Sequence, residues 1–242
     1  AIEFGLRSLS IAEKINHPLR IVSALINIAL AYGDNNKYDK ALNYYDRAFP
    51  YLESLNNAGL SKGYYFGVGT ILSDQGNYGE ALKKFEEALL ITENTLFYTE
   101  NLLLVGKAYF NLGEFDKANE YVNKAHTIAL GQNQQDEKVK ILIEKGKINR
   151  ERNAAESIRF YKEAEVLAKE INLPYELKEI YLGISESYIK IGDFKNGYEY
   201  QSKYIDQMDL IFNLETDDKI RGLQFEFDLD KKQDEIVLLE KE

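Results

Sequence analysis

The chain has 242 residues, three prolines, no cysteine and a formal net charge of −10. The lack of cysteine excludes disulfides and thiolate chemistry, and the negative charge, with no basic stripe to interrupt it, disfavours binding to nucleic acid or anionic lipid through this segment. The sequence contains no signal peptide and no run of about 18 apolar residues. Eighteen tyrosines and twelve phenylalanines with so few prolines favour packed helices over strands.

Small residues that follow an aromatic or apolar residue by three recur along the chain at a nearly constant interval. Their spacings, by subtraction, are 40, 40, 37, 39 and 40 residues. The set is Ser8, Ala48, Ala88, Ala125, Ala164 and the substituted Tyr204. A period of this size predicts stacked supersecondary units, so function is expected on a surface built by stacking and not in a catalytic pocket.

Residues 1–16 are interpreted as the second helix of a unit whose first helix lies outside the chain. Pro18 then starts the next helix, where its missing N–H costs nothing. The first full unit, 19–56, is predicted to be a helix, a tight turn at Asn36 and a second helix. Pro50 lies in that second helix and is expected to kink it or end it early.

The next two units, 59–95 and 97–131, share one spacing most clearly. Gly76 and Gly113 mark the turns, because glycine readily takes the left-handed conformation that ends a helix. The shared positions are Gly69, Gly76, Tyr78, Ala81, Phe85, Ala88 and Gly106, Gly113, Phe115, Ala118, Val122, Ala125. The small residues among them let two helices approach closely.

The last two units, 136–171 and 175–210, match less well. In the first, the turn at Asn153 is one residue short, with Ser157 in place of an alanine and Tyr161 as the aromatic. In the second, Pro174 starts the first helix and Gly192 marks the turn.

This pattern resembles the tetratricopeptide repeat (TPR) over nearly all of residues 1–210. The family's repeat has about 34 residues, so each unit here carries a few more. The family's common tryptophan is replaced by Leu25, Tyr65, Leu102 and Tyr181. The resemblance implies an all-α fold, a right-handed α-α superhelix (TPR solenoid) with a leading half unit and five full units.

Residues 211–242 are expected to form a charged linker helix that leaves the array. From Asp209 to Glu242, eleven acidic residues face five basic ones. The apolar residues give two helical seams, but four of them also alternate as in a strand. The seams are Ile220, Leu223, Phe227 and Phe225, Leu229, Ile236, Leu239. The polar run 231–235 favours a helix, which predicts a short coiled coil and a homodimer through this segment.

The segments 209–213, 219–224, 230–236 and 238–242 resemble the linker that follows the TPR array in Bacteroidetes-type bacterial membrane receptors, although Gly222, Phe225 and Phe227 depart from it. That resemblance implies a sensor region whose linker leads to a histidine kinase, a cyclase or a DNA-binding output. Ala1 lies within a repeat and Glu242 within a helical pattern, so both natural ends are expected outside this chain. A periplasmic location is therefore expected, with a cytoplasmic one as the alternative.

No residues suggest an enzyme, a metal site or a cofactor. His17 and His126 are far apart in the sequence and are read as surface positions. The glycines at 59, 63, 67 and 69 lack the Gly-Lys-Ser/Thr ending of a phosphate loop. Asp217 and Asp218 lack the spacing of a calcium loop and are read as a solvated face.

The TPR resemblance implies that the first helix of each unit lines an inner groove. Residues on the open face of these helices are therefore the candidate contacts for a peptide or protein partner. They are Ile26, Asn27, Leu30, Phe66, Thr70, Leu103, Lys107, Phe110, Lys140, Ile143, Lys147, Arg150, Leu182 and Glu186. Lys140, Lys147 and Arg150 form a basic patch that could bind a carboxylate or an acidic peptide, or could only keep the helix solvated.

The function predicted from the sequence is a peptide- or protein-binding TPR module that serves as the sensor region of a bacterial signal-transduction receptor, in a two-component or related system. A free-standing TPR scaffold is the alternative. A TPR-type regulator of response-regulator phosphorylation is disfavoured, because such proteins carry an N-terminal helical bundle that has no counterpart here. A membrane is expected only through a segment outside this chain.

Overall fold

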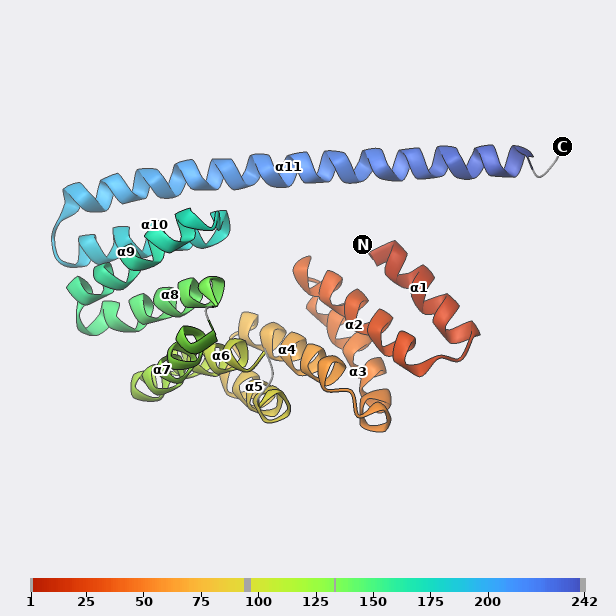
Figure 1. Ribbon diagram of the computed structural model, residues 1–242, viewed down its shortest axis with the longest axis horizontal. Coiled ribbons are helices and arrows are strands. Elements are labelled where there is room, and N and C mark those ends of the chain that lie inside the picture. Colours follow the sequence, from red (N-terminus) through yellow and green to blue (C-terminus); the bar gives the residue numbers. More distant parts are fainter. Residues whose placement is uncertain (1, 94–96, 133, 240–242) are drawn as a thin grey trace. The chain divides into compact units, whose positions relative to one another are not determined.

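The computed structural model describes residues 2–93, 97–132 and 134–239, and over these residues the chain forms eleven α-helices and no strand (Figure 1). The helices are α1 (Ile2–Lys14), α2 (Pro18–Asp34), α3 (Tyr38–Leu55), α4 (Ala58–Asp74), α5 (Tyr78–Thr92), α6 (Tyr98–Asn111), α7 (Phe115–Gln132), α8 (Gln135–Arg152), α9 (Ala154–Glu170), α10 (Pro174–Lys190) and α11 (Phe194–Leu239). The all-α prediction is confirmed.

The chain divides into two compact units, residues 1–144 and 145–242, and the boundary falls at Glu144 and Lys145 of α8. In the first unit α2 packs on α3, α4 on α5 and α6 on α7, and successive hairpins nest through α2 and α4 and through α5 and α6. In the second unit α10 packs on both α9 and α11. Each unit is a stretch of helical solenoid, because a hairpin buries its apolar face only against its neighbours.

The repeated small residues lie where helices approach most closely. The alanines at 29, 41, 48, 81, 88, 118, 125 and 164 are fully buried. A Cβ added to Gly69 would lie 2.6 Å from the ring of Phe85, so the glycine makes room for the aromatic side chain. Two members of the set differ. Ser8 is exposed, because α1 turns Leu9 and Ala12 towards the core instead, and Tyr204 is only half-buried.

The turns follow the sequence prediction. Asn36, Gly76, Gly113 and Gly192 all have positive φ, between 56° and 81°. The turns between units also contain a residue in the left-handed conformation, namely Asn16, Asn56 or Asn172, at φ of 43° to 56°. The shortened turn contains Asn153 alone between α8 and α9, and its side chain caps α9 by accepting a hydrogen bond from the backbone N–H of Glu156 at 3.2 Å.

Pro50 does not end its helix. α3 continues through it to Leu55, where Asn56 closes the helix in the left-handed conformation. Pro50 is exposed, so the backbone carbonyl that loses its N–H partner there can be hydrated. The expectation of an early end was wrong.

The last helix, α11, is one continuous element of 46 residues (Figure 1). It begins as the second helix of the last hairpin, so residues 211–239 continue that helix and do not form a separate one. Burial ends near Ile211, and Tyr175 of α10 donates a hydrogen bond to Glu215 at 3.2 Å. The choice of helix over strand is confirmed for residues 211–239.

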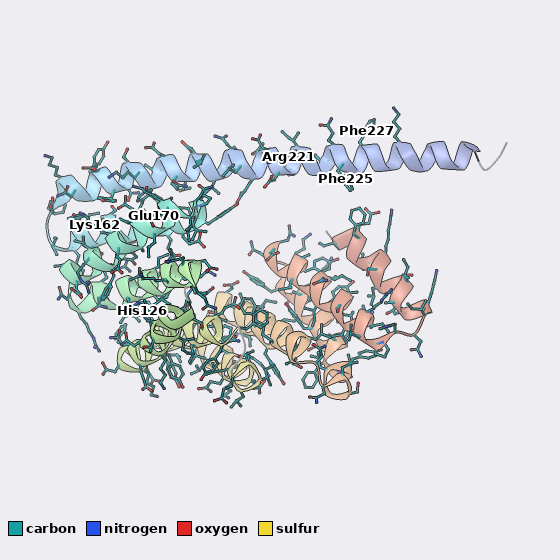
Figure 2. The ribbon with its side chains drawn as sticks, viewed as in Figure 1. His126, Lys162, Glu170, Arg221, Phe225 and Phe227 are labelled. Atoms are coloured by element: carbon teal, nitrogen blue, oxygen red, sulfur yellow. The ribbon has the colours of Figure 1, made fainter. Side chains whose placement is uncertain are left out.

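Beyond Glu215 the described apolar side chains of α11 are exposed, namely Ile220, Leu223, Phe225 and Phe227. Phe225 and Phe227 are 64% and 69% exposed and project from the helix (Figure 2). The side chains of Leu229, Ile236 and Leu239 lie outside the described residues, so the second seam stays a prediction. Within the described residues, no helix is both long enough and apolar enough to cross a membrane.

Candidate functional site

The candidate contact residues lie on α2, α4, α6, α8 and α10, the first helices of the five hairpins, as predicted. Asn27, Leu30 and Glu186 are exposed. Eight are half-buried, namely Phe66, Thr70, Lys107, Phe110, Lys140, Lys147, Arg150 and Leu182. An apolar side chain with part of its surface open to solvent is what a partner side chain can cover.

Three of the candidates are packing residues. Ile26, Leu103 and Ile143 are only 5%, 3% and 2% exposed, so they offer almost no area to a partner. Ile26 packs on α4, with a methyl carbon 3.5 Å from the point that a Cβ on Gly63 would occupy. The glycine brings α2 and α4 close together and closes the face that the spacing had placed in the groove.

The basic residues of the expected patch, Lys140, Lys147 and Arg150, all pair with carboxylates, and so do Lys62, Lys107 and Lys190 on the first helices. All of these except Lys140 pair with a carboxylate on a neighbouring first helix. The pairs are Lys62–Glu100 at 2.8 Å, Lys107–Glu144 at 3.3 Å, Lys190–Glu151 at 2.7 Å, Lys147–Glu179 and Arg150–Glu186. Lys140 instead pairs with Glu137 on its own helix at 2.8 Å. An acidic partner would have to displace these carboxylates, so the patch is not an open anion site.

Glu144 is buried at 2% exposed, but the other pairs are part-exposed, so each of those is worth about 0–1 kcal/mol. The pair with Lys190 also shifts a pKa. The hydrogen bond from Lys190, and then its positive charge, hold the pKa of the Glu151 carboxyl below its usual range. Within each unit, these pairs link the first helices of neighbouring hairpins.

A pocket of about 210 Å³ opens within the first unit, between α2, α3 and α4. Its walls include Leu30, Phe66 and Thr70, three of the predicted contact residues, together with Ile71. Asp34 and Asp74, the last residues of α2 and α4, also line it. The pocket therefore combines an apolar wall with two carboxylates.

Tyr45 of α3 lines the same pocket. Its side chain is 0% exposed, and its hydroxyl has no hydrogen-bond partner among the described residues. A Cβ on Gly67 would lie 1.8 Å from this hydroxyl, so only glycine at position 67 leaves room for it. Burial, followed by the charge of Asp34, raises the pKa of Tyr45, which keeps the phenol neutral and able to donate or accept.

Sequence reasoning missed this pocket, because Tyr45 was read only as a packing residue of the repeat. One signal was present. Asp34 and Asp74 are 40 residues apart at equivalent helix ends, where a negative side chain is unfavourable. The equivalent residues of α6 and α10 are Asn111 and Lys190, which suit that position better.

The histidines lie apart from this pocket. His17 is exposed at the start of α2, and His126 is half-buried on α7 (Figure 2). Over the part of the chain that the structure describes, no group of three His, Cys, Asp or Glu residues could hold a metal ion.

Two family models match the chain, and both describe tetratricopeptide repeats. One matches residues 22–49 and 99–130, and the other matches residues 67–96. These segments cover most of the hairpins α2–α3, α4–α5 and α6–α7. No curated protein matches the chain.

Several solved structures share the fold at low sequence identity. BtubC from P. vanneervenii aligns with a TM-score of 0.71 at 16% identity, over 87% of this chain and 90% of that one. The apo quorum sensor NprR from B. thuringiensis gives 0.72 at 21%, over 86% and 59%. The Rap conjugation gene regulator of plasmid pLS20, in complex with the Phr* peptide, gives 0.69 at 20%, over 83% and 57%. The chain thus spans less than two thirds of the length of the last two.

At such identities these similarities establish the fold alone. The family matches identify the hairpins α2–α3, α4–α5 and α6–α7 as tetratricopeptide repeats.

Proposed function

We propose that the chain is a peptide- or protein-binding module whose partner lies along the first helices. The observation that carries the proposal is the set of partly open apolar side chains on the first helices of the first unit, Leu30, Phe66 and Phe110, with charges on the same helices that are already paired. Such a surface offers apolar anchors surrounded by polar groups, and because its charges are paired it does not favour a partner of one charge over the other. The Rap regulator of similar fold, solved with its Phr* peptide, supports the proposal.

The finer form of the proposal is that the module senses its partner for a signalling receptor. In this form α11 carries the signal, because its first part packs on α10 while its described apolar side chains from Ile220 to Phe227 are exposed. Ser185 of α10 donates a hydrogen bond to the backbone oxygen of Gly197 at 2.8 Å, so a shift of α10 would be passed to α11. The exposed apolar side chains beyond Glu215 are the surface through which two copies would pair.

A free-standing adaptor is the second candidate. A reporter fusion and a truncation distinguish it from the sensor of a receptor. If α11 transmits a signal in a receptor, fusing a reporter kinase to the end of α11 should make the reporter respond to the partner. If the chain is an adaptor, the partner should bind equally well to a chain truncated after Glu215, and the reporter should not respond. A regulator of response-regulator phosphorylation would instead change the dephosphorylation rate of a response regulator.

The binding itself is tested by selecting peptides from a random library on the immobilised chain and measuring the affinity of each by calorimetry. Phe66→Ala should weaken binding by about tenfold, because it removes an anchor from the first-helix face. Tyr198→Ala is the matched control, since Tyr198 is 79% exposed on α11. Failure to select any peptide, or equal loss in both variants, would contradict the proposal.

A further inference from the structure

The pocket between α2, α3 and α4 combines features that belong to one kind of ligand. Its wall is apolar, with Leu30, Phe66 and Ile71, and carboxylates line it at Asp34 and Asp74. A lysine or arginine side chain is the complement of this arrangement, because its methylene stem covers apolar surface while its charged end seeks carboxylates. At about 210 Å³ the pocket is smaller than the usual site of a drug-sized ligand, which suits a single side chain.

The electrostatics of the helix ends point the same way. Asp34 and Asp74 are the final residues of α2 and α4, where the helix dipoles already place partial negative charge. None of the described lining residues is basic, and neither carboxylate has an ion-pair partner among the described residues. Two unpaired carboxylates and two helix C-termini therefore meet at one pocket, and each favours a cation.

A second, independent observation is the hydroxyl of Tyr45. It is fully buried at the pocket, pressed against Gly67, and has no partner among the described residues. An unpaired buried hydroxyl is destabilising, and phenylalanine at position 45 would avoid that cost. An N–H donor that enters the pocket would give the hydroxyl the hydrogen bond that it lacks.

We infer that this pocket binds a basic side chain of the partner peptide, with arginine preferred over lysine. A guanidinium offers five donors in a planar fork, enough for two carboxylates and the Tyr45 hydroxyl, and it stacks on an aromatic face such as that of Phe66. Lys62, whose ammonium lies 5.2 Å from the centre of the Phe66 ring, is held by Glu100 at 2.8 Å, so its charge is already compensated. The inference rests on the proposed function and names the chemistry of one contact in it.

The test uses the whole chain and two small probes of matched shape. N-acetyl-arginine methylamide and its neutral isostere N-acetyl-citrulline methylamide are titrated while the backbone amide signals of Gly33, Gly67 and Thr70 are followed by NMR. The arginine probe should shift these signals saturably, and the citrulline probe should bind at least about tenfold more weakly, because it lacks the charge. Equal responses to the two probes, or no saturable shift with arginine, would overturn the inference.

Variants then assign the contact. Asp34→Asn with Asp74→Asn should weaken the arginine probe by about tenfold or more and leave the citrulline probe unchanged. Tyr45→Phe should weaken it by a few-fold. Asp206→Asn, an exposed site on α11, is the matched control and should change nothing. Circular dichroism confirms that each variant is folded, and unchanged arginine binding in the double aspartate variant would overturn the inference.

The outcome can be separated from that of the proposed function. If library peptides bind but show no preference for a basic residue, and the arginine probe shifts no signal in the pocket, the inference fails while the binding module stands. If the arginine probe binds in the pocket but no peptide is selected, the pocket is real and the peptide-binding function fails.

Discussion

The two aspartates at the ends of α2 and α4 should cost the free protein stability. Replacing both Asp34 and Asp74 by asparagine removes two negative charges from helix C-termini, each worth about 0.3–1 kcal/mol where the side chain is exposed, as both are. At about 0.5 kcal/mol per site, the double variant gains about 1 kcal/mol. For a chain of this size that corresponds to a rise in Tm of about 2–4 °C.

The assay is thermal unfolding followed by circular dichroism, at low and at high salt. The gain should shrink at high salt, because exposed charges are screened there. Asn111→Asp is the matched control, since it places an aspartate at the equivalent end of α6 and should lower Tm by about 1–2 °C. If the variant with both Asp34→Asn and Asp74→Asn is no more stable than the parent at low salt, the reasoning is refuted. A gain in stability together with a loss of arginine binding would mark the aspartates as functional.

Three further predictions concern packing, charge and pH. Gly183→Ala should destabilise by about 1–3 kcal/mol, because its Cβ would lie 2.2 Å from the ring of Tyr161, which is 1% exposed; denaturant unfolding measures this, and no loss would contradict it. Lys147→Glu should lower the free energy of unfolding by up to about 1 kcal/mol, because it places a second negative charge against Glu179. Adding Glu179→Lys should recover this stability, and a double variant that recovers none would rule out the pair. Burial first, and then neighbouring carboxylates, raise the pKa of Tyr64 to about 12. The unfolded chain loses this proton near pH 10, so stability should fall between about pH 10 and 12. The difference in tyrosinate absorbance between the parent and Tyr64→Phe, read with ellipticity as pH rises, would test this, and half ionisation of Tyr64 near pH 10 with helicity kept would disprove it.

The repeat architecture could be predicted because local chemistry dictates it. Asn36, Gly76, Gly113 and Gly192 stand where a helix must end in the left-handed conformation, and the structure has them there. The alanines of the packing stripe are buried for an equally local reason, since only a small side chain fits where two helices touch.

The candidate site was harder to predict, because it depends on contacts between repeats. Ile26 has the spacing of an open position but is closed by Gly63 of the next helix. Lys147 and Glu179 are distant in sequence, so no spacing rule pairs them. Helical spacing gives the direction of a side chain on its own helix, but not what the neighbouring helix brings against it.

The end of the array shows the same limit. The sequence pattern changes near residue 210, which suggests a new element, but the backbone of α11 continues without a break. A change of surface polarity marks where packing stops and not where a helix stops. Pro50 is the complementary case, since a residue that usually breaks helices is tolerated inside α3 at an exposed position.

The most direct test of the binding proposal is amide hydrogen exchange of the whole chain with and without a selected peptide. The proposal predicts that protection rises on the first helices, at Leu30, Phe66 and Phe110, and not on the second helices. The second helices offer a fair comparison, because Leu90 and Val166 are 79% and 58% exposed there. Protection that rises around Leu90 or Val166, with none on α2, α4 or α6, would contradict the account.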